Sequence, residues 1–265
     1  MNALAAAVVV AVLSYNVHGL HKLVVSDDPE ARMPQISSRL NAYDVALIQE
    51  DWEYDDLLAA QATHPVKERG NGPHPPRFFQ AGLATFARLA FVALSRGSLG
   101  ACAGWLGGAN DCFADKGFLR LRLRLANGVA IDFWTLHLDA GDAESDRAAR
   151  AKQLETLVAR VKSLSGDAAL VVGGDFNSKE DVPADRALLD RFAAAVGLTD
   201  TGARPAPDGA FAREHIDYVF YRPSAAASIA VVDAGEAREF SDGPAPLSDH
   251  PAVFAKLRVA PVTSP

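Results

Sequence analysis

The stretch "ALVVGGDFNS", residues 169–178, joins an apolar run to a polar turn. Two glycines end the run, and the chain then presents an acid, an aromatic ring and a carboxamide. Asp175 and Asn177 are two residues apart, so on an extended segment both side chains face the same side. We therefore predict a buried strand that ends by presenting Asp175 and Asn177 to one site.

The composition is typical of a soluble globular protein. The chain has 265 residues, of which 49% are hydrophobic and 22% charged, and a net charge of −7. This length can bury a large core, and we expect one domain over residues 1–265. Nucleic-acid affinity comes largely from Lys and Arg that neutralise phosphates, so the negative charge disfavours a broad basic surface. The alternative is a nuclease with a narrow basic groove lined by Lys179, Arg213 and Arg222.

The N-terminal segment "ALAAAVVVAVL" is apolar. It has no positive n-region, because no Lys or Arg precedes Lys22, and it is shorter than the roughly 20 residues that cross a bilayer. We expect residues 1–7 to be a leader remnant or disordered, and we expect no transmembrane segment. The protein would be secreted or periplasmic, with a cytoplasmic location left open.

The chain has two cysteines, Cys102 and Cys112, separated by a glycine-rich loop. Such a loop closes easily, so we predict a disulfide, which would suit an exported protein. Two free thiols in a cytosolic chain are the alternative.

Short apolar runs alternate with helical patterns, which indicates an α/β fold. We predict strands at 8–16, 44–49, 82–87, 118–126, 129–136, 168–174, 215–221 and 250–258. We predict helices at 33–42, 51–61, 144–165 and 184–196, and a loop at 63–78, which is rich in proline and glycine.

The clearest local pattern is "LRLRLANGVAIDFWTL". It predicts two alternating strands around Asn127 and Gly128, a pair suited to a type I′ turn. The leucines at 119, 121, 123 and 125 would face the core, and the arginines at 120, 122 and 124 would face solvent.

Polar groups of one chemical kind lie at or near several strand ends. They are Asn16 in "LSYNVHG", Glu50 in "DVALIQE", His137 in "DFWTLHLDA", Asp175 and Asn177, Asp217 in "HIDYVFY", and Asp249 with His250 in "LSDHPAVFA". A sheet gathers its strand ends at one edge, so these groups can converge. Asp217 within a strand needs a partner, since burial of a lone carboxylate is costly, and a histidine would serve.

Carboxylate and carboxamide oxygens are hard ligands that suit Mg²⁺. Cysteine and histidine do not occur at the spacings of a zinc site. We therefore expect Mg²⁺, with Mn²⁺ or another divalent cation as the alternative.

The ordered set "SYNVHG", "LIQE", "TLHLD", "GGDFN", "IDYVF" and "SDHPAV" resembles the endonuclease/exonuclease/phosphatase superfamily of deoxyribonuclease I-like phosphoesterases. The resemblance extends from Ser14 to about Phe254. It implies an α/β fold of four layers, with two mixed sheets face to face, helices outside and a site at one edge.

The resemblance also implies a role for each residue. Glu50, aided by Asn16, would hold the divalent ion, and Asp249 would help to position the metal or the water. His250 would be the general base that deprotonates water, oriented by Asp217. Asp175 and Asn177 would hold the nucleophile and the phosphate, and His137 would stabilise charge on the phosphorus oxygens.

Within the superfamily, "NDCFADKGFLRLRL" followed by "TLHLDAGDAESDRAARAKQLETL" is similar to the neutral and bacterial sphingomyelinase branch. Lys116 matches its Lys-Gly strand start and is a candidate substrate-binding residue. The long aromatic hairpin of the bacterial enzymes is not found near the C-terminus.

The resemblance predicts a monomeric phosphodiesterase that cleaves a phospholipid of sphingomyelin type. The loop with Trp105, Leu106 and Phe113 would contact a membrane or pack against the sandwich. A nuclease is the alternative, and a binding module without catalysis is a third reading.

Overall fold

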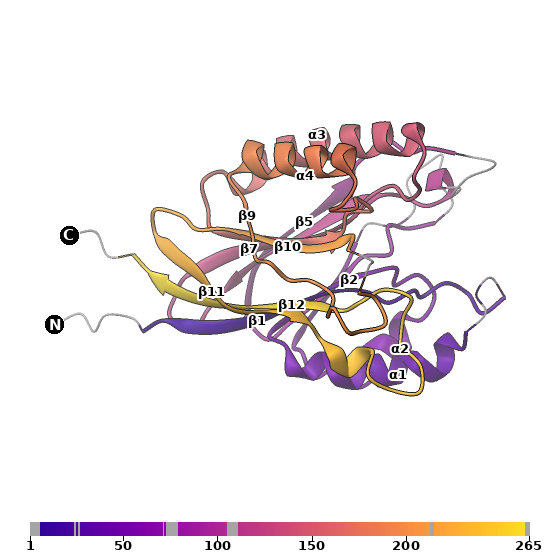
Figure 1. Ribbon diagram of the computed structural model, residues 1–265. Helices are drawn as coiled ribbons and strands as arrows, with labels where there is room; N and C mark the ends of the chain where they lie inside the picture. Colours follow the sequence, from indigo (N-terminus) through magenta and orange to yellow (C-terminus); the bar gives the residue numbers. More distant parts are fainter. Residues whose placement is uncertain are drawn as a thin grey trace.

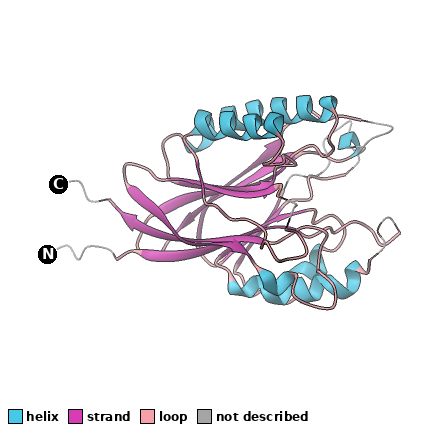
Figure 2. Ribbon diagram, viewed as in Figure 1, coloured by secondary structure: helices cyan, strands magenta, loops and turns pink. Residues whose placement is uncertain are grey.

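The computed structural model describes residues 6–23, 25, 27–70, 72, 79–104, 111–212 and 215–262. Its core is two six-stranded sheets packed face to face, with helices on both outer faces (Figures 1 and 2). The predicted four-layer α/β sandwich is confirmed.

The first sheet has the order β11-β12-β1-β2-β4-β3. Its strands are β1 (Val8–Asn16), β2 (Val45–Gln49), β3 (Val66–Arg69), β4 (Ala84–Ala87), β11 (Ala227–Glu236) and β12 (Val253–Pro261). The second sheet has the order β5-β6-β7-β8-β10-β9. Its strands are β5 (Ala90–Ser98), β6 (Gly117–Arg124), β7 (Ala130–His137), β8 (Leu170–Asp175), β9 (Thr199–Asp200) and β10 (Asp217–Arg222).

The helices cover the outer faces. The first sheet carries α1 (Pro29–Arg39), α2 (Asp55–Ala59) and the 3₁₀ turns η1 (Leu40–Ala42) and η3 (Arg238–Phe240), packed on the outer faces of β1 and β2. The second sheet carries α3 (Glu144–Ser165) and α4 (Pro183–Val196), which run along its outer face in Figure 1. A further 3₁₀ turn, η2 (Asp111–Phe113), precedes β6. No helix in these described ranges has the length and apolar character to cross a bilayer.

Between the sheets lies an apolar core to which nearly every strand contributes. The leucines at 119, 121, 123 and 125 are buried there as predicted, opposite valines and leucines of β1, β2 and β12. The two glycines of "VVGG" let β8 lie close to the facing sheet and to the neighbouring strand β7. A Cβ at Gly173 would lie 2.7 Å from Leu47 of the facing sheet, and one at Gly174 would clash with the backbone oxygen of Leu136.

Several local predictions are wrong. The segment 63–78 is not all loop, because β3 lies within it; residues 71 and 73–78 are outside the described residues. The turn at Asn127 and Gly128 is not type I′, since only Gly128 has a positive φ, of 86°. The Gly128 N–H donates to Leu125 O at 2.9 Å, so a type I turn is followed by a glycine bulge.

The arginines of β6 do not all face solvent. Asp132 is fully buried and accepts hydrogen bonds at 2.7–2.9 Å from both Arg120, itself 5% exposed, and Arg122. A buried carboxylate needs charged donors, and the two arginines supply them to Asp132. The outer face of the second sheet therefore carries an ion-pair cluster at this point.

Candidate active site

Each sheet has one parallel pair of strands, β1 with β2 and β7 with β8. Parallel strands bring their carboxyl ends to the same edge, and these four ends carry or precede Asn16, Glu50, His137 and Asp175. β10 and β12 run antiparallel to their neighbours and therefore begin at that edge. The edge lies opposite the chain termini in Figure 1.

A histidine–aspartate pair lies at the centre of this edge. His250 Nδ1 is 2.9 Å from Asp217 Oδ2, and Asp217 is fully buried. Burial by itself would lower the pKa of His250, but the carboxylates of Asp217 and Asp175 raise that pKa well above its usual value. The bond through Nδ1 leaves Nε2 facing the neighbouring acids, 3.8 Å from Asp175 Oδ2.

Asn16 connects the two sheets. Its amide nitrogen is 3.1 Å from Glu50 Oε1 and 3.1 Å from Asp175 Oδ2, and its Oδ1 accepts from the His18 N–H at 3.0 Å. Asn16 therefore orients the carboxylate of Glu50 rather than presenting an oxygen to the site.

The donor set fits a divalent cation. Glu50 Oε2 is buried and accepts no hydrogen bond from any residue that the structure describes. Burial acts to raise the pKa of Glu50, but His18, the charge of His250 and the Asn16 amide hold that pKa well below its usual range, so the carboxylate is charged. Asp175, Asp217 and His250 also offer ligand atoms within 4.8 Å of one another. An oxygen-rich, anionic set of this kind is what Mg²⁺ prefers.

Asp175 is fully enclosed between the two histidines. Burial raises its pKa to about 7, while the nearby His250 opposes that shift. Asp175 and Asp217 are direct partners in the β8–β10 ladder. The site therefore concentrates negative charge that only a cation or protons can balance.

On the other side of the site, His137 is buried and contacts Lys116. Lys116 Nζ is 3.3 Å from His137 Nε2 and 2.7 Å from Asp111 Oδ1. Burial, and then the charge of Lys116, lower the pKa of His137 well below its usual value. His137 is therefore neutral, and it lies 3.5 Å from Asp175 Oδ2.

Three non-glycine residues at the site have left-handed backbone conformations: His18 (φ 48°), Glu50 (φ 56°) and Asn177 (φ 47°). Such conformations are strained and are held by their surroundings. The expectation that Asn177 is extended beyond Asp175 is thus wrong. Its N–H donates to Asp175 Oδ1 at 2.8 Å, and its Nδ2 donates to Leu138 O at 3.0 Å.

The sequence-predicted residues are not equally central. Six of them form one contact network: Asn16, Glu50, His137, Asp175, Asp217 and His250. Lys116 joins through His137. The side chain of Asp249 is 56% exposed and contacts His18 Nδ1 at 3.2 Å, not Glu50.

Three residues were missed. His18 lies between Asp249 and Glu50, 3.7 Å from Glu50 Oε2. Arg32 is buried in α1 and donates to the carbonyls of Val17, His18 and Leu247, which ties the loop after β1 to the loop before β12. Asp111 holds Lys116. His18 lies inside the quoted "SYNVHG" and Asp111 inside the quoted "NDCFADKGFLRLRL", whereas none of the quoted motifs contains Arg32.

Two pockets flank the site. The aromatic pocket, of about 490 Å³, is lined by Trp52, Phe79, Phe113, Glu53 and Asp111 and reaches Glu50, Lys116 and His137. The other, of about 620 Å³, adjoins His18, Asp249 and His250. The reacting groups thus lie between two cavities.

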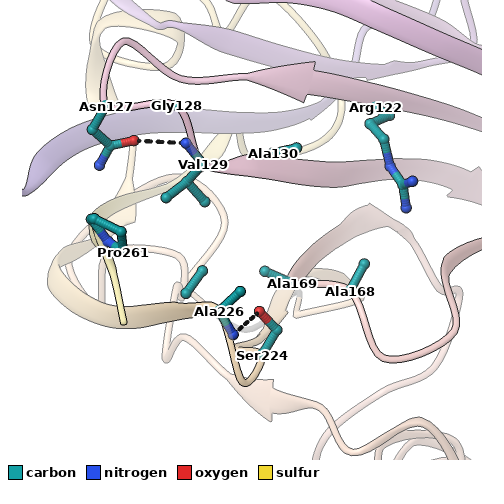
Figure 3. A pocket seen from close by; sticks show the side chains of 11 residues that line it. Arg122, Asn127, Gly128, Val129, Ala130, Ala168, Ala169, Ser224, Ala226 and Pro261 are labelled. Carbon is teal, nitrogen blue, oxygen red and sulfur yellow. Dashed lines mark hydrogen bonds between the residues drawn. The ribbon is translucent and has the colours of Figure 1, made fainter. Parts of the chain in front are cut away.

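A third pocket, of about 510 Å³, lies at the far end of the sandwich (Figure 3). Asn127 accepts there from the Val129 N–H, and Ser224 Oγ from the Ala226 N–H, so these side chains close turns. Arg122 at its edge is paired with Asp132. It contains none of the site residues.

Cys102 and Cys112 form a disulfide, as predicted. Ala103 and Asp111, each next to a cysteine, bind the segment after β7: Asp139 Oδ2 accepts from the Ala103 N–H at 3.0 Å, and Asp111 Oδ2 accepts from the Ala140 N–H at 2.8 Å. Trp105 and Leu106 lie outside the described residues; Phe113 is half-buried.

The comparisons with known proteins agree with this fold. The chain belongs to the Endonuclease/Exonuclease/phosphatase family, whose sequence model matches residues 13–250. A sphingomyelinase of Mycobacterium bovis is 30% identical over 275 residues, covering 94% of this chain and 52% of the relative. The chain thus spans about half the length of the curated relatives it matches.

Solved structures agree on the fold. Staphylococcus aureus beta toxin with bound magnesium ions has a TM-score of 0.72 at 17% identity, covering 93% of this chain and 98% of the toxin. Sphingomyelinase C of Streptomyces griseocarneus has a TM-score of 0.70 at 18% identity, covering 94% and 99%.

Proposed function

We propose that the protein is a Mg²⁺-dependent phosphodiesterase that hydrolyses a choline phospholipid of sphingomyelin type, releasing phosphocholine. The observation that carries the proposal is the His250–Asp217 pair facing the carboxylates of Glu50 and Asp175. An acid-supported imidazole beside an oxygen-rich cation site is the equipment that hydrolysis of a phosphodiester needs.

The reaction starts with His250. Asp217 holds its Nδ1–H, so that Nε2 can accept a proton from the attacking water. Glu50, oriented by Asn16, would hold the cation, which supplies Lewis-acid stabilisation of charge on the phosphoryl oxygens when bound. Asp249 would act through His18 on the same carboxylate.

The remaining residues act on the phosphate. Asp175 and the strained Asn177 would position the water and a phosphate oxygen. His137 is neutral, and Lys116 beside it would add positive charge where negative charge accumulates in the transition state. In-line displacement places the leaving group opposite His250, toward the His137 side.

The lipid substrate is supported by two independent features. The relatives at 30% identity carry the name sphingomyelinase. The aromatic pocket combines three rings with the exposed carboxylate of Glu53, a lining that favours a quaternary ammonium group.

The number of domains, the oligomeric state and the compartment are also proposals. We infer a single domain, a monomer, and an oxidising compartment such as the periplasm or the exterior, since a disulfide persists there.

The test is turnover of sphingomyelin vesicles and of plasmid DNA, side by side, with Mg²⁺ or with EDTA, for the wild type and His250→Ala. We expect lipid cleavage by the wild type with Mg²⁺ only. DNA nicking without lipid cleavage would make it a nuclease, and no turnover by either protein on any phosphodiester would make it a binding module.

A further inference from the structure

Two of the reacting residues lie beyond the strand pairing that joins their segments. The ladder between β1 and β12 ends at the pair Ser14 and Val253. Asn16 follows Ser14 by two residues, and His250 precedes Val253 by three. The pairing of β1 with β12 therefore stops before it reaches either residue, and other contacts must fix the place of one relative to the other.

Arg32 of α1 makes one such contact with both segments. Its Nη1 donates to Leu247 O at 3.0 Å and to Val17 O at 2.5 Å, and its Nη2 donates to His18 O. Val17 and His18 belong to the segment after β1, whereas Leu247 belongs to the segment before β12. One planar guanidinium group, whose donors have a fixed geometry, thus sets the separation of two loops.

The guanidinium group of Arg32 is enclosed by the protein. Arg32 is 6% exposed, and its Nε lies 2.6 Å from Asp27 Oδ2. A buried cation is costly unless it is paired and its donors are satisfied, and a buried carbonyl left without a donor is costly as well. Arg32 and the two loops therefore hold one another in one arrangement.

The backbone at His18 depends on the same contact. The φ of His18 is 48°, a strained conformation for a residue other than glycine. The carbonyls of Val17 and His18 both accept from Arg32, which stabilises this turn. The His18 N–H donates in turn to Asn16 Oδ1 at 3.0 Å, and the Asn16 amide lies 3.1 Å from Glu50 Oε1. The orientation of Glu50 therefore depends on Arg32 through the turn at His18.

A second hydrogen bond continues the connection toward the imidazole. Ser248 Oγ donates to Asn16 O at 2.7 Å and accepts from the His250 N–H at 3.3 Å. Ser248 directly follows Leu247, whose carbonyl Arg32 holds. A displacement of Leu247 would therefore move His250 relative to the carboxylates that it faces.

We propose that Arg32 is a positioning residue for the reaction, which fixes His250 and the pair Asn16 and Glu50 in one geometry by holding the main chain of two loops. The inference rests on the proposed function for the roles of these three side chains. It adds that the reaction depends on a guanidinium group that acts only through other residues.

A second arginine provides a matched control. Arg222 is half-buried and donates to the carbonyls of Val196, Gly166 and Ala168 at 2.5–2.9 Å. It therefore also binds three main-chain carbonyls through one guanidinium group. Arg222 is the last residue of β10, whereas Asp217, at the site, is the first. Loss of Arg222 removes hydrogen bonds of the same kind at the opposite end of the strand.

The experiment compares the wild type, Arg32→Met, Arg32→Lys and Arg222→Met in the hydrolysis of micellar sphingomyelin with Mg²⁺. Urea unfolding first establishes conditions in which each variant is folded. Both Arg32 variants should lower kcat by about 10², because a displacement of about 1 Å has an effect of that size. KM should stay near the wild-type value, since binding of the ground state is unchanged. Arg222→Met should keep the wild-type kcat.

Calorimetry of Mg²⁺ binding without substrate gives a second readout, which a loss of stability alone would not change. Arg32→Met should bind Mg²⁺ at least about tenfold more weakly, because the orientation of Glu50 is no longer held. Arg222→Met should bind Mg²⁺ as the wild type does. If Arg32→Met does not fold, Arg32→Lys serves in both measurements, because lysine keeps the buried charge but lacks the planar fork.

A wild-type kcat in either Arg32 variant, or equal losses in Arg32→Met and Arg222→Met, would overturn the inference and leave the proposed function intact. An unchanged Mg²⁺ affinity in Arg32→Met would also overturn it. A wild type that hydrolyses no phosphodiester would contradict the proposed function instead, and the Mg²⁺ affinities would then test the positioning by Arg32 on their own.

Discussion

His250 Nδ1 lies 2.9 Å from Asp217 Oδ2, across 33 residues of sequence, and joins the loop before β12 of the first sheet to the first residue of β10 in the second. This bond fixes which nitrogen of the imidazole faces the site. It also places a buried negative charge beside the ring, and the carboxylate is one cause of the raised pKa of His250.

Asp217→Asn should change both the rate and its pH dependence. A general base acts only when unprotonated, so kcat/KM falls as pH drops through the pKa of His250. Asparagine removes the charge that raises this pKa, and the acidic limb should move to lower pH. The plateau should fall by about 10² to 10⁴, the usual contribution of a positioned base. If kcat/KM at high pH falls but the acidic limb of the pH profile does not move, His250 is not the general base whose pKa Asp217 raises.

Glu50→Gln should weaken Mg²⁺ binding, measured by calorimetry without substrate, by at least about tenfold, because a charged ligand becomes neutral. Thermal unfolding gives a second readout, since a ligand at about 100 times its Kd stabilises a protein by about 2.7 kcal/mol and the variant would lack most of this gain. Glu53→Gln, three residues on and exposed, is the control and should bind Mg²⁺ as the wild type does.

Asp139→Asn should flatten the dependence of stability on pH. Asp139 is fully buried, and burial, aided by Asp111, raises its pKa from 3.8 to about 7. Between these values the folded state keeps a proton that the unfolded state has lost, so the stability from this group is present at low pH and falls as pH rises, by about 1.4 kcal/mol per unit.

Urea unfolding in EDTA from pH 4 to pH 8 measures this effect. The asparagine variant should be the more stable protein at pH 8, and its Oδ1 can still accept from the Ala103 N–H. The exposed Asp142→Asn should keep the wild-type slope, within about 0.5 kcal/mol. An unchanged slope in Asp139→Asn would show that the carboxyl is ionised throughout.

Cys102→Ser/Cys112→Ser should lower the free energy of unfolding by about 3 kcal/mol, since the bridge closes a loop of separation 10 and restricts the unfolded chain. Reductant should bring the wild type to the same urea midpoint. A wild type insensitive to reductant and equal to the double variant would mean that the thiols are not paired in solution.

The fold was predictable because its inner strands carry strong signals. The segment 8–16 is β1 to the residue, and 144–165 is α3. The strands that were missed, β3, β5, β9 and β11, lie at the sheet edges. Their half-exposed residues do not alternate cleanly, and their conformation depends on pairing with a neighbour rather than on a local pattern.

The part of the site that could be predicted is the part whose residues lie at the ends of strands. Asn16, Glu50 and Asp175 adjoin one another because β1, β2 and β8 end at one edge. The left-handed φ of Asn177 and the contacts of His18 and Asp111 depend on how loops meet in space, and no spacing in the sequence encodes that. The catalytic roles stay predictions until they are assayed.

Each sheet supplies part of the reacting set: Asn16 and Glu50 from one, His137, Asp175 and Asp217 from the other. The thickness of the interior therefore sets the separation of the reacting groups. At Gly173 the second sheet packs closely on the first, because an added Cβ would lie 2.7 Å from Leu47 Cδ1 and 3.4 Å from Ser14 Cβ. A single methyl group there would act as a wedge, and chemistry at the edge would be altered from a position that no substrate can reach.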